Sequence, residues 1–518
     1  MKNLRVLMAV GLTASMLIAG CTSKTATEAT PKGSTEPTAA ATVAANKPDI
    51  SKEVKLKMYL IGDAPKDLGL VYEEVNKMLK KDINATVEPV FLSWGDYVQK
   101  YPLLFATGED FDLIYAANWY KYSEFANKGS YKELTTDMLN KYAPLTMKEI
   151  PKEAWDQVKV QNKIFMIPSS NKDFAMATVG VRGDLREKYK IAPLKTVDDF
   201  EKYLDTIAKN EPSLVPFDEN AAGYALYDMI IGAETSTKVT VSNTLLSLDL
   251  KDKSGKLIDV GQTPQYLEYA KKMADWSKRG FWSKNALVNK TPSKDSFLAG
   301  KSSSMAGNSL DMSNTVTAAN QKHPEWKAEM FDLYNGKPTY VSNYSSNGMS
   351  INANSKNPER ALMMLDLFRN NEDYFNLTTY GIKGKHYDLT ADKKVQALNG
   401  SDSGYKPDSG SPWGWRTAGL YKALSDQPAA FTAIKETWTK TAITNPLLNF
   451  VLDTTNIKNE LAAIKNVKDQ YRDPINLGVL ADATEAVKTL NAKYKEAGLE
   501  KIQAEAQKQI DDFLKNNK

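Results

Sequence analysis

The stretch TGEDFDLIYAANW, residues 107–119, reads as a loop, a short buried strand and a polar, aromatic exit. The apolar run at 111–116, bounded by Gly and acidic residues, is typical of a central parallel strand. Ligands of open α/β sheets bind beyond the carboxyl ends of such strands, where Asn118 and Trp119 follow here. An amide beside a flat ring suits a polar ligand with apolar faces, such as a sugar. The alternative is a surface loop whose Trp packs on a neighbouring helix.

The preceding residues extend this strand into a sheet. Residues 54–60 alternate apolar side chains with Lys and Tyr, and residues 86–92 read as a second strand. Helical patterns follow each strand, the first capped by Asp67 and the second opened by Ser93-Trp94-Gly95-Asp96, which resembles a capping box. This β-α-β-α-β order predicts a parallel sheet with right-handed crossovers. Three strand exits should then converge on one edge: Gly62-Asp63, Ser93-Trp94 and Asn118-Trp119.

Composition excludes several classes of function. The chain has 518 residues with 67 basic and 63 acidic side chains, a balance that gives no electrostatic case for nucleic acid. One cysteine cannot form an intramolecular disulfide. Two histidines in the whole chain argue against a His-based metal site, and no motif indicates a cofactor. We therefore expect neither a metal nor a cofactor.

The N-terminus predicts the compartment. Lys2 and Arg5 precede an apolar run at 6–18 that is too short to span a membrane. The following Leu17-Ile18-Ala19-Gly20-Cys21 resembles the lipobox of a bacterial lipoprotein signal, which implies cleavage before Cys21 and lipid attachment to its sulfur. The alternative is an ordinary secretory signal with a chance cysteine. Residues 22–49 are rich in Thr, Ala, Pro, Lys and Ser and should form a flexible tether to the membrane.

Several motifs together resemble one family. They are ATGEDFDLI at 106–114, FANKG at 125–129, KEL at 132–134, NKIFMIP at 162–168, FLAGKSSSMAGN at 297–308 and YGIKGKHY at 380–387. The chain thereby resembles the extracellular solute-binding proteins of ABC importers, in their carbohydrate-associated group. Asn162 stands where that family usually has Gly, a tolerable exchange because Asn also accepts a positive φ.

The resemblance implies an α/β fold of the type II periplasmic-binding-protein kind, with two lobes. Each lobe would be a mostly parallel sheet flanked by helices, followed by a helical C-terminal extension. The expected division is a signal peptide at 1–20, a lipidated tether at 21–51, a first lobe at 52–168 plus about 345–375, and a second lobe at 169–344 plus about 376–518. Helices are expected at 429–440, 454–471, 474–495 and 499–515, and Thr196 should cap another.

Candidate ligand contacts come from the strand exits and from one later loop. The loop SPWGW at 411–415 carries two tryptophans, which either face a ligand or pack against the core. The full set of predicted contacts is Asp63, Trp94, Asn118, Trp119, Asn308, Trp413 and Trp415.

Catalysis is the weaker interpretation. The chain has no phosphate-binding loop, dinucleotide fingerprint or G-x-S-x-G elbow. Glu109, Asp110 and Asp112 could suggest a glycosidase, but its two carboxylates must flank a bond about 5–10 Å apart. Two adjacent loop acids and one strand acid fit that geometry poorly, so we read them as solvated turn acids.

The expected function is binding, without enzymatic activity. A monomeric lipoprotein on the extracytoplasmic face of the cell membrane would capture a carbohydrate, preferably an oligosaccharide, between its lobes and deliver it to an ABC-type permease. A secreted carbohydrate-active hydrolase is the alternative, and an adhesion or structural lipoprotein is a third class.

Overall fold

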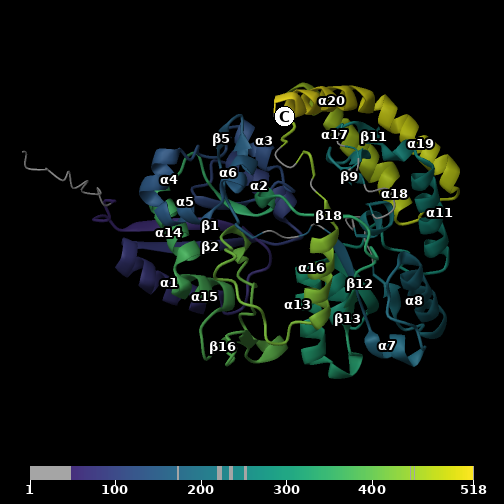
Figure 1. Ribbon diagram of the computed structural model, residues 1–518, viewed down its shortest axis with the longest axis horizontal. Coiled ribbons are helices and arrows are strands. Elements are labelled where there is room, and N and C mark those ends of the chain that lie inside the picture. Colours follow the sequence, from purple (N-terminus) through teal and green to yellow (C-terminus); the bar gives the residue numbers. More distant parts are fainter. Residues whose placement is uncertain are drawn as a thin grey trace, which may run out of the picture. The chain divides into compact units, whose positions relative to one another are not determined.

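The computed structural model describes residues 48–516, except 172–173, 175, 219–224, 233–236, 250–251, 253, 444 and 448–449 (Figure 1). The predicted signal peptide, Cys21 and all but the last residues of the predicted tether lie outside the described residues. Residues from Pro48 onward form one compact unit. Within the described ranges, no helix is both long and apolar enough to cross a membrane.

The first sheet has the strand order β2-β1-β3-β15-β6. Its strands are β1 (Val54–Ile61), β2 (Ala85–Leu92), β3 (Leu113–Ala116), β6 (Ile167–Pro168) and β15 (Gly348–Ile351). β1 runs parallel to β2 and to β3, with α1 (Leu68–Ile83) and α2 (Tyr97–Ala106) as the connections. The predicted β-α-β-α-β order is therefore confirmed. β15 enters from far along the chain and runs antiparallel to both β3 and β6.

The chain around this sheet is mostly helical (Figure 1). The remaining elements here are α3 (Tyr122–Asn127), α4 (Thr136–Tyr142), α5 (Pro144–Glu149), α6 (Lys152–Gln157), the hairpin β4 (Lys159–Val160) and β5 (Lys163–Ile164), α14 (Pro358–Asn370) and α15 (Glu372–Tyr380). Asn162 lies in the hairpin turn with φ 63°, which confirms that it fills a position where Gly would be comfortable.

The second sheet has the order β13-β7-β12-β8. Its strands are β7 (Ala177–Val181), β8 (Val215–Phe217), β12 (Ser302–Asn308) and β13 (Glu329–Phe331), and β7 alone runs antiparallel to its neighbours. Its chain segment also holds α7 (Gly183–Lys188), α8 (Val197–Asn210), α9 (Ala225–Tyr227), α11 (Pro264–Lys278), α12 (Ser293–Leu298) and α13 (Ser309–Lys322). Thr196 caps α8, as predicted, and it does so in a capping box with Asp199. The capping box expected at residues 93–96 is wrong, because α2 starts after Asp96 without a side-chain cap hydrogen bond.

A smaller antiparallel sheet and the C-terminal helices complete the fold. The small sheet joins β9 (Thr237–Val239), β10 (Leu246–Asp249) and β11 (Leu257–Asp259). Two-stranded pairs are β14 (Thr339–Tyr340) with β18 (Ala442–Ile443) and β16 (Tyr387–Leu389) with β17 (Val395–Ala397). The last helices are α16 (Ala429–Thr441), α17 (Lys458–Val467), α18 (Asp473–Asn476), α19 (Ala483–Glu496) and α20 (Leu499–Asn516).

One predicted helix is broken. The pattern at 474–495 predicts a continuous helix, but α18 ends at Asn476 and α19 starts only at Ala483. Gly478 has φ 61°, and a Cβ added there would lie 2.0 Å from the carbonyl oxygen of Met273. This close approach of two backbones requires Gly and ends the helix.

The buried apolar side chains form two large clusters and a small one. The first cluster draws on residues 56–167 and 344–374, with Tyr405 and Trp415 added. The second draws on residues 176–340 and 431–510, and the small third runs from Phe375 to Leu424. We keep the predicted division into lobes as a proposal, with Tyr405 and Trp415 moved from the second lobe to the first.

Candidate ligand-binding site

The carboxyl ends of β1, β2 and β3 lie next to one another at one edge of the first sheet. The amide of Gly62 donates to the carbonyl of Leu92 at 2.9 Å, and the amide of Asn118 donates to the carbonyl of Ser345 at 2.8 Å. The three exits therefore converge as the parallel order predicts.

Three tryptophans from different parts of the chain pack against one another at this edge. The ring centroids of Trp94 and Trp413 are 5.8 Å apart with planes at 29°, and those of Trp94 and Trp119 are 6.3 Å apart with planes at 32°. Trp119 is 46% exposed, while Trp94 and Trp413 are half-buried. We call these three rings the tryptophan surface. It leaves aromatic area available to a ligand.

Two tyrosines that the sequence reasoning missed support the tryptophan surface. The Tyr97 ring stands edge-on to Trp94 at 5.7 Å and to Trp119 at 6.2 Å. The Tyr115 ring stands edge-on to Trp413 at 6.2 Å. Edge-to-face packing fixes ring orientation as well as position. Tyr97 could have been found from its place three residues after Trp94, on the first turn of α2.

The loop that carries Trp413 is bound directly to the first sheet. The hydroxyl of Ser411 donates to the carbonyl of Ile61 at 2.9 Å. Gly62 has φ 134°, and a Cβ there would lie 2.8 Å from the Ser411 Oγ and 3.9 Å from atoms of the Trp94 and Trp413 rings. Gly62 therefore provides the space in which this loop meets the end of β1.

Trp415 does not take part in this surface. Its side chain is fully buried, its Nε1 donates to the Thr378 hydroxyl at 3.1 Å, and its ring lies 5.4 Å from that of Phe368. Trp415 therefore packs against the core and does not face a ligand, and the prediction that it contacts the ligand is wrong.

The predicted polar contacts are exposed, but two are partly occupied. The side-chain amide of Asn118 donates to the Ser345 hydroxyl at 3.0 Å, which leaves its oxygen as an acceptor. The Asn308 side chain ends β12 on the second sheet and accepts from the Asp311 amide at 2.9 Å as the cap of α13, which leaves its NH₂ as a donor. Asp63 is exposed and forms no hydrogen bond or ion pair with another described residue.

Charged groups of α12 and of the loop before it interact with groups at this edge. The pKa of the Asp295 carboxyl, on α12, is raised above its ordinary value, chiefly by desolvation. The positive charge of Lys294 opposes the shift, and the negative charges of Asp63 and Asp311 add to it. The pKa of Asp96 is lowered, chiefly by its hydrogen bond to Lys100, with a smaller contribution from Lys290. Asp63 and Asp96 thus interact with groups contributed by the second sheet's part of the chain.

The acids before β3 have structural partners. Asp112 is buried, and its carboxylate accepts from the Lys57 amide at 3.1 Å and from the Ser355 hydroxyl at 2.6 Å. Glu109 accepts from the Lys57 ammonium at 3.2 Å. Because these contacts bind the acids to β1 and to the segment after β15, they do not form the opposed pair that a glycosidase needs. Asp112 is thus a buried structural acid and not a solvated turn acid.

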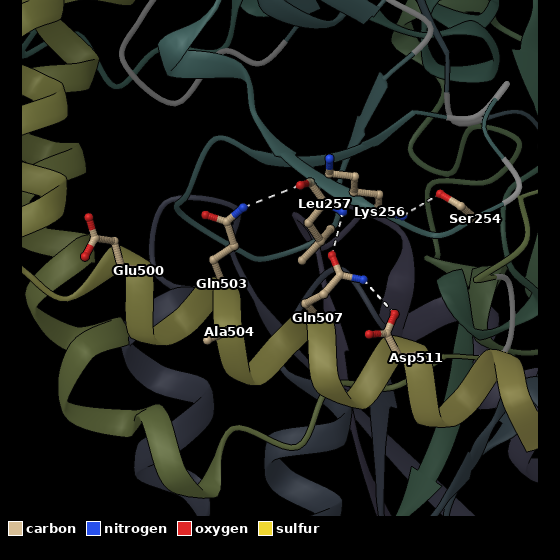
Figure 2. A pocket seen from close by; sticks show the side chains of 8 residues that line it. All are labelled: Ser254, Lys256, Leu257, Glu500, Gln503, Ala504, Gln507 and Asp511. Atoms are coloured by element: carbon tan, nitrogen blue, oxygen red, sulfur yellow. Dashed lines mark hydrogen bonds between the residues drawn. The ribbon is translucent and has the colours of Figure 1, made fainter.

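No group of three or more His, Cys, Asp or Glu in the described ranges could hold a metal ion. A surface hollow of about 570 Å³ lies between β11 and α20 (Figure 2). Its glutamines already bind the protein: Gln507 accepts from the Leu257 amide at 2.8 Å and donates to Asp511 at 2.9 Å. It offers no aromatic side chain, so we place the site at the tryptophan surface instead.

Two known proteins are similar to this chain in sequence. A carbohydrate ABC transporter substrate-binding protein of Streptococcus pneumoniae serotype 4 is 26% identical over 89% of this chain and 91% of its own. The polygalacturonan/rhamnogalacturonan-binding protein YtcQ of Bacillus subtilis is 25% identical over 41% of this chain and 43% of its own.

Among solved structures, the N-glycan transport solute binding protein NgtS of Streptococcus pneumoniae, in complex with Man1GlcNAc, superposes with a TM-score of 0.75. It is 24% identical, over 89% of this chain and all of that one, and so supports the two-lobed fold.

Two family models match the chain. Residues 446–515 match a domain of unknown function (DUF3502), which covers α17 to α20. Residues 66–374 match the model described as bacterial extracellular solute-binding protein, and this match spans more than half of the chain. The chain belongs to the bacterial extracellular solute-binding protein family.

Proposed function

We propose that this protein captures a carbohydrate, an oligosaccharide, on the tryptophan surface and delivers it to an ABC-type permease. The packing of Trp94 against Trp119 and Trp413, which leaves aromatic area exposed, supports the proposal. Aromatic faces desolvate the C–H surface of a sugar ring, and amides or carboxylates satisfy its hydroxyls. The similar proteins are named for the transport or binding of carbohydrates, N-glycans and polygalacturonan among them. These names support a carbohydrate as the ligand.

Each polar residue then has a defined role. The free oxygen of Asn118 and the carboxylate of Asp63 accept from sugar hydroxyls, and the free NH₂ of Asn308 donates to one. Asn308 belongs to the second sheet, so a ligand that reaches it contacts both lobes. Only a ligand that binds the closed form better than the open form shifts that equilibrium. Closure would present the loaded protein to the permease.

The location follows from the N-terminal motif. The lipobox-like segment at 17–21 supports cleavage before Cys21 and attachment of a lipid to its sulfur. Two acyl chains on that cysteine would suffice for stable anchoring. We propose that the protein is a monomeric lipoprotein on the extracytoplasmic face of the membrane.

Binding without turnover is part of the proposal. The family consists of solute-binding proteins, and the acids that suggested a hydrolase bind Lys57 and Ser355 instead. Incubation with oligosaccharides should release no new reducing ends.

Replacement of Trp119 tests the site. Trp119→Ala removes the most exposed ring of the tryptophan surface and should weaken oligosaccharide binding at least tenfold, since stacked rings contribute about 1.5 kcal/mol or more on burial. Titration calorimetry with the best ligand of an oligosaccharide panel measures this. Leu103→Ala, which removes an exposed apolar side chain from α2 in the same lobe, is the control. Equal affinity of both variants would exclude the tryptophan surface as the site.

A further inference from the structure

A buried ion pair closes the base of the loop that carries Trp413. The Nη2 of Arg416 donates to the Oδ1 of Asp408 at 2.7 Å, and both residues are only 7% exposed. The partners flank residues 409–415, so the pair joins the two ends of the loop. The hydroxyl of Tyr421 donates to the Oδ2 of Asp408 at 2.6 Å, and the Arg416 guanidinium lies over the Tyr421 ring, 4.9 Å from its centroid. Both oxygens of the Asp408 carboxylate are therefore bound.

The backbone of this loop adopts conformations that need support from their surroundings. Asp408 has φ 64° and Ser411 has φ 52°, both in the left-handed region that residues other than glycine seldom occupy. Such residues persist where the surrounding structure holds them in place. The Asp408 amide donates to the Thr379 carbonyl at 2.8 Å, and the Ser411 amide donates to the Asp408 carbonyl at 3.2 Å. The ion pair therefore holds the first residue of a loop that is strained at two positions.

Trp413 depends on this loop for its place in the tryptophan surface. Trp94 and Trp119 follow β2 and β3 within three residues, whereas Trp413 is carried to the same edge by the loop alone. A buried ion pair adds little net stability over an apolar pair of similar volume, but the loss of one partner leaves the other charge buried without compensation. The base of the loop would then rearrange to solvate that charge. Closing a strained loop thus favours a role in placing Trp413 over a role in stabilising the fold.

Resting on the proposed function, we infer that Asp408 and Arg416 are positioning residues that hold Trp413 ready for the ligand. They act on the ligand only through the Trp413 ring, which they keep in the orientation that stacks on Trp94. A loop fixed before binding loses less conformational freedom when the saccharide arrives, so the ion pair raises affinity without touching the ligand.

A double-mutant cycle between Arg416 and Trp413 tests this role. Arg416→Gln should weaken binding of the best oligosaccharide about tenfold, measured by titration calorimetry on the full-length mature protein. In a Trp413→Ala background the same substitution should leave the affinity unchanged, because the ring that the ion pair positions is already absent. Urea unfolding gives the folded fraction to which each affinity is referred. A substitution that only weakens the fold would lower binding by the same factor in both backgrounds.

Hydrogen exchange measures the loop without any ligand. The Ser411 amide, bonded to the Asp408 carbonyl, and the Trp415 amide, bonded to the Pro412 carbonyl at 3.1 Å, should exchange about tenfold faster in Arg416→Gln. Amides of β1 and β3 should keep their wild-type protection. Unchanged exchange in the loop, or equally faster exchange in both strands, would contradict a positioning role.

A milder variant covers the case in which Arg416→Gln does not fold. Tyr421→Phe removes one hydrogen bond to Asp408, keeps the ion pair, and should weaken binding about threefold, an effect absent from the Trp413→Ala background.

Arg182→Gln is the matched control. Arg182 also pairs with an aspartate, Asp184 at 2.6 Å, and also lies over an aromatic ring, that of Trp326 at 4.4 Å from its centroid. It follows β7 at the end of that strand opposite to the one paired with Asn308, so its loss should leave affinity unchanged.

The outcomes separate this inference from the proposed function. Wild-type affinity in both Arg416→Gln and Tyr421→Phe, or equal losses with and without Trp413, would overturn the inference and leave saccharide capture intact. Absence of saccharide binding by the wild type would instead contradict the proposed function.

Discussion

Two tryptophans in one short loop have opposite environments. Trp413 is half-buried and stacks on Trp94, whereas Trp415 is fully buried beside Phe368. Gly414 lies between them, and a Cβ there would come within 2.4 Å of the Met349 sulfur. The loop thus enters the protein at Gly414 and divides the pair into one surface ring and one core ring.

This division predicts separable effects. Trp415→Ala should reduce the free energy of unfolding by about 3–5 kcal/mol, the usual cost of removing a large buried ring, with ligand affinity preserved in the folded fraction. Trp413→Ala should weaken ligand binding and cost much less stability. Urea unfolding and calorimetry on both variants measure the two quantities. A stable Trp415→Ala that has lost binding would show that the roles are reversed.

Single residues were predictable where the cause is local. Thr196 caps α8 and Asn162 takes a positive φ, and in both cases residues only a few positions away determine the conformation. Asp67 precedes α1 as predicted, but its carboxylate lies 3.1 Å from the His386 ring and makes no cap hydrogen bond. That partner is far along the chain, as is the partner that buries Trp415. Contacts between residues so far apart in the chain cannot be predicted from the local sequence.

At the scale of elements, α20 covers a strand edge with side chains. β11 is an edge strand of its sheet, and Gln507 accepts from the Leu257 amide at 2.8 Å (Figure 2). The same side chain donates to the Gly255 carbonyl at 3.2 Å. One glutamine therefore bonds to the strand as a paired backbone would. Free strand edges invite pairing with other chains, and this contact blocks that.

Replacement of this glutamine should expose the edge. Gln507→Ala should lower the hydrogen-exchange protection of the Leu257 amide and destabilise the protein by about 1 kcal/mol, because a buried donor loses its acceptor. Lys508→Ala, next to it on the outer face of α20, is the control and should leave that amide protected. Unchanged protection in Gln507→Ala would mean that the edge is covered by something other than α20.

The elements themselves were predictable to different degrees. The period-two and helical patterns located β1, α1, β2, α2 and β3, and their order fixed the parallel sheet. The family resemblance led us to expect residues 345–375 in the first lobe, and β15 pairs there with β3. The break between α18 and α19 was missed although local signals mark it: Gly478 has a positive φ after α18, and the Asp482 side chain caps α19 by accepting from the Glu485 amide.

At the scale of the whole molecule, one ion pair connects segments that are far apart in the sequence. Glu149, at the end of α5, pairs with the fully buried Arg369 of α14 at 2.7 Å. The same carboxylate accepts from the Ser170 hydroxyl and from the Thr417 hydroxyl, the latter at 2.7 Å. Ser170 follows β6, and Thr417 follows the loop at 411–415 that carries Trp413. Glu149 therefore holds both of these segments against α14.

Protonation of Glu149 in acid should remove the stability that its ion pair with Arg369 contributes. Burial alone would raise the pKa of Glu149, but Arg369 and the two hydroxyls outweigh it and hold the pKa below the ordinary 4.5. A lowered pKa stabilises the folded state at pH values above 4.5, and this stabilisation is lost as the pH falls through the folded-state value. Glu149→Gln should lose about 3–5 kcal/mol at neutral pH, since Arg369 stays buried without a counter-charge.

Unfolding by urea between neutral pH and pH 3 measures this dependence. The wild type should lose stability below about pH 4.5 more steeply than Glu149→Gln does. Glu133→Gln removes an exposed pair with Lys163 and should behave like the wild type. Parallel pH profiles for the wild type and Glu149→Gln would show that the ion pair does not set acid stability.

The most direct measurement is a crystal structure of the wild-type protein with the oligosaccharide that binds best. We predict at least one sugar ring packed flat against Trp119 or Trp413, hydrogen bonds from its hydroxyls to Asn118 and Asp63, and contact with Asn308 from the second sheet. A saccharide bound elsewhere, as in the hollow between β11 and α20, with the tryptophan surface uncovered, would contradict the account.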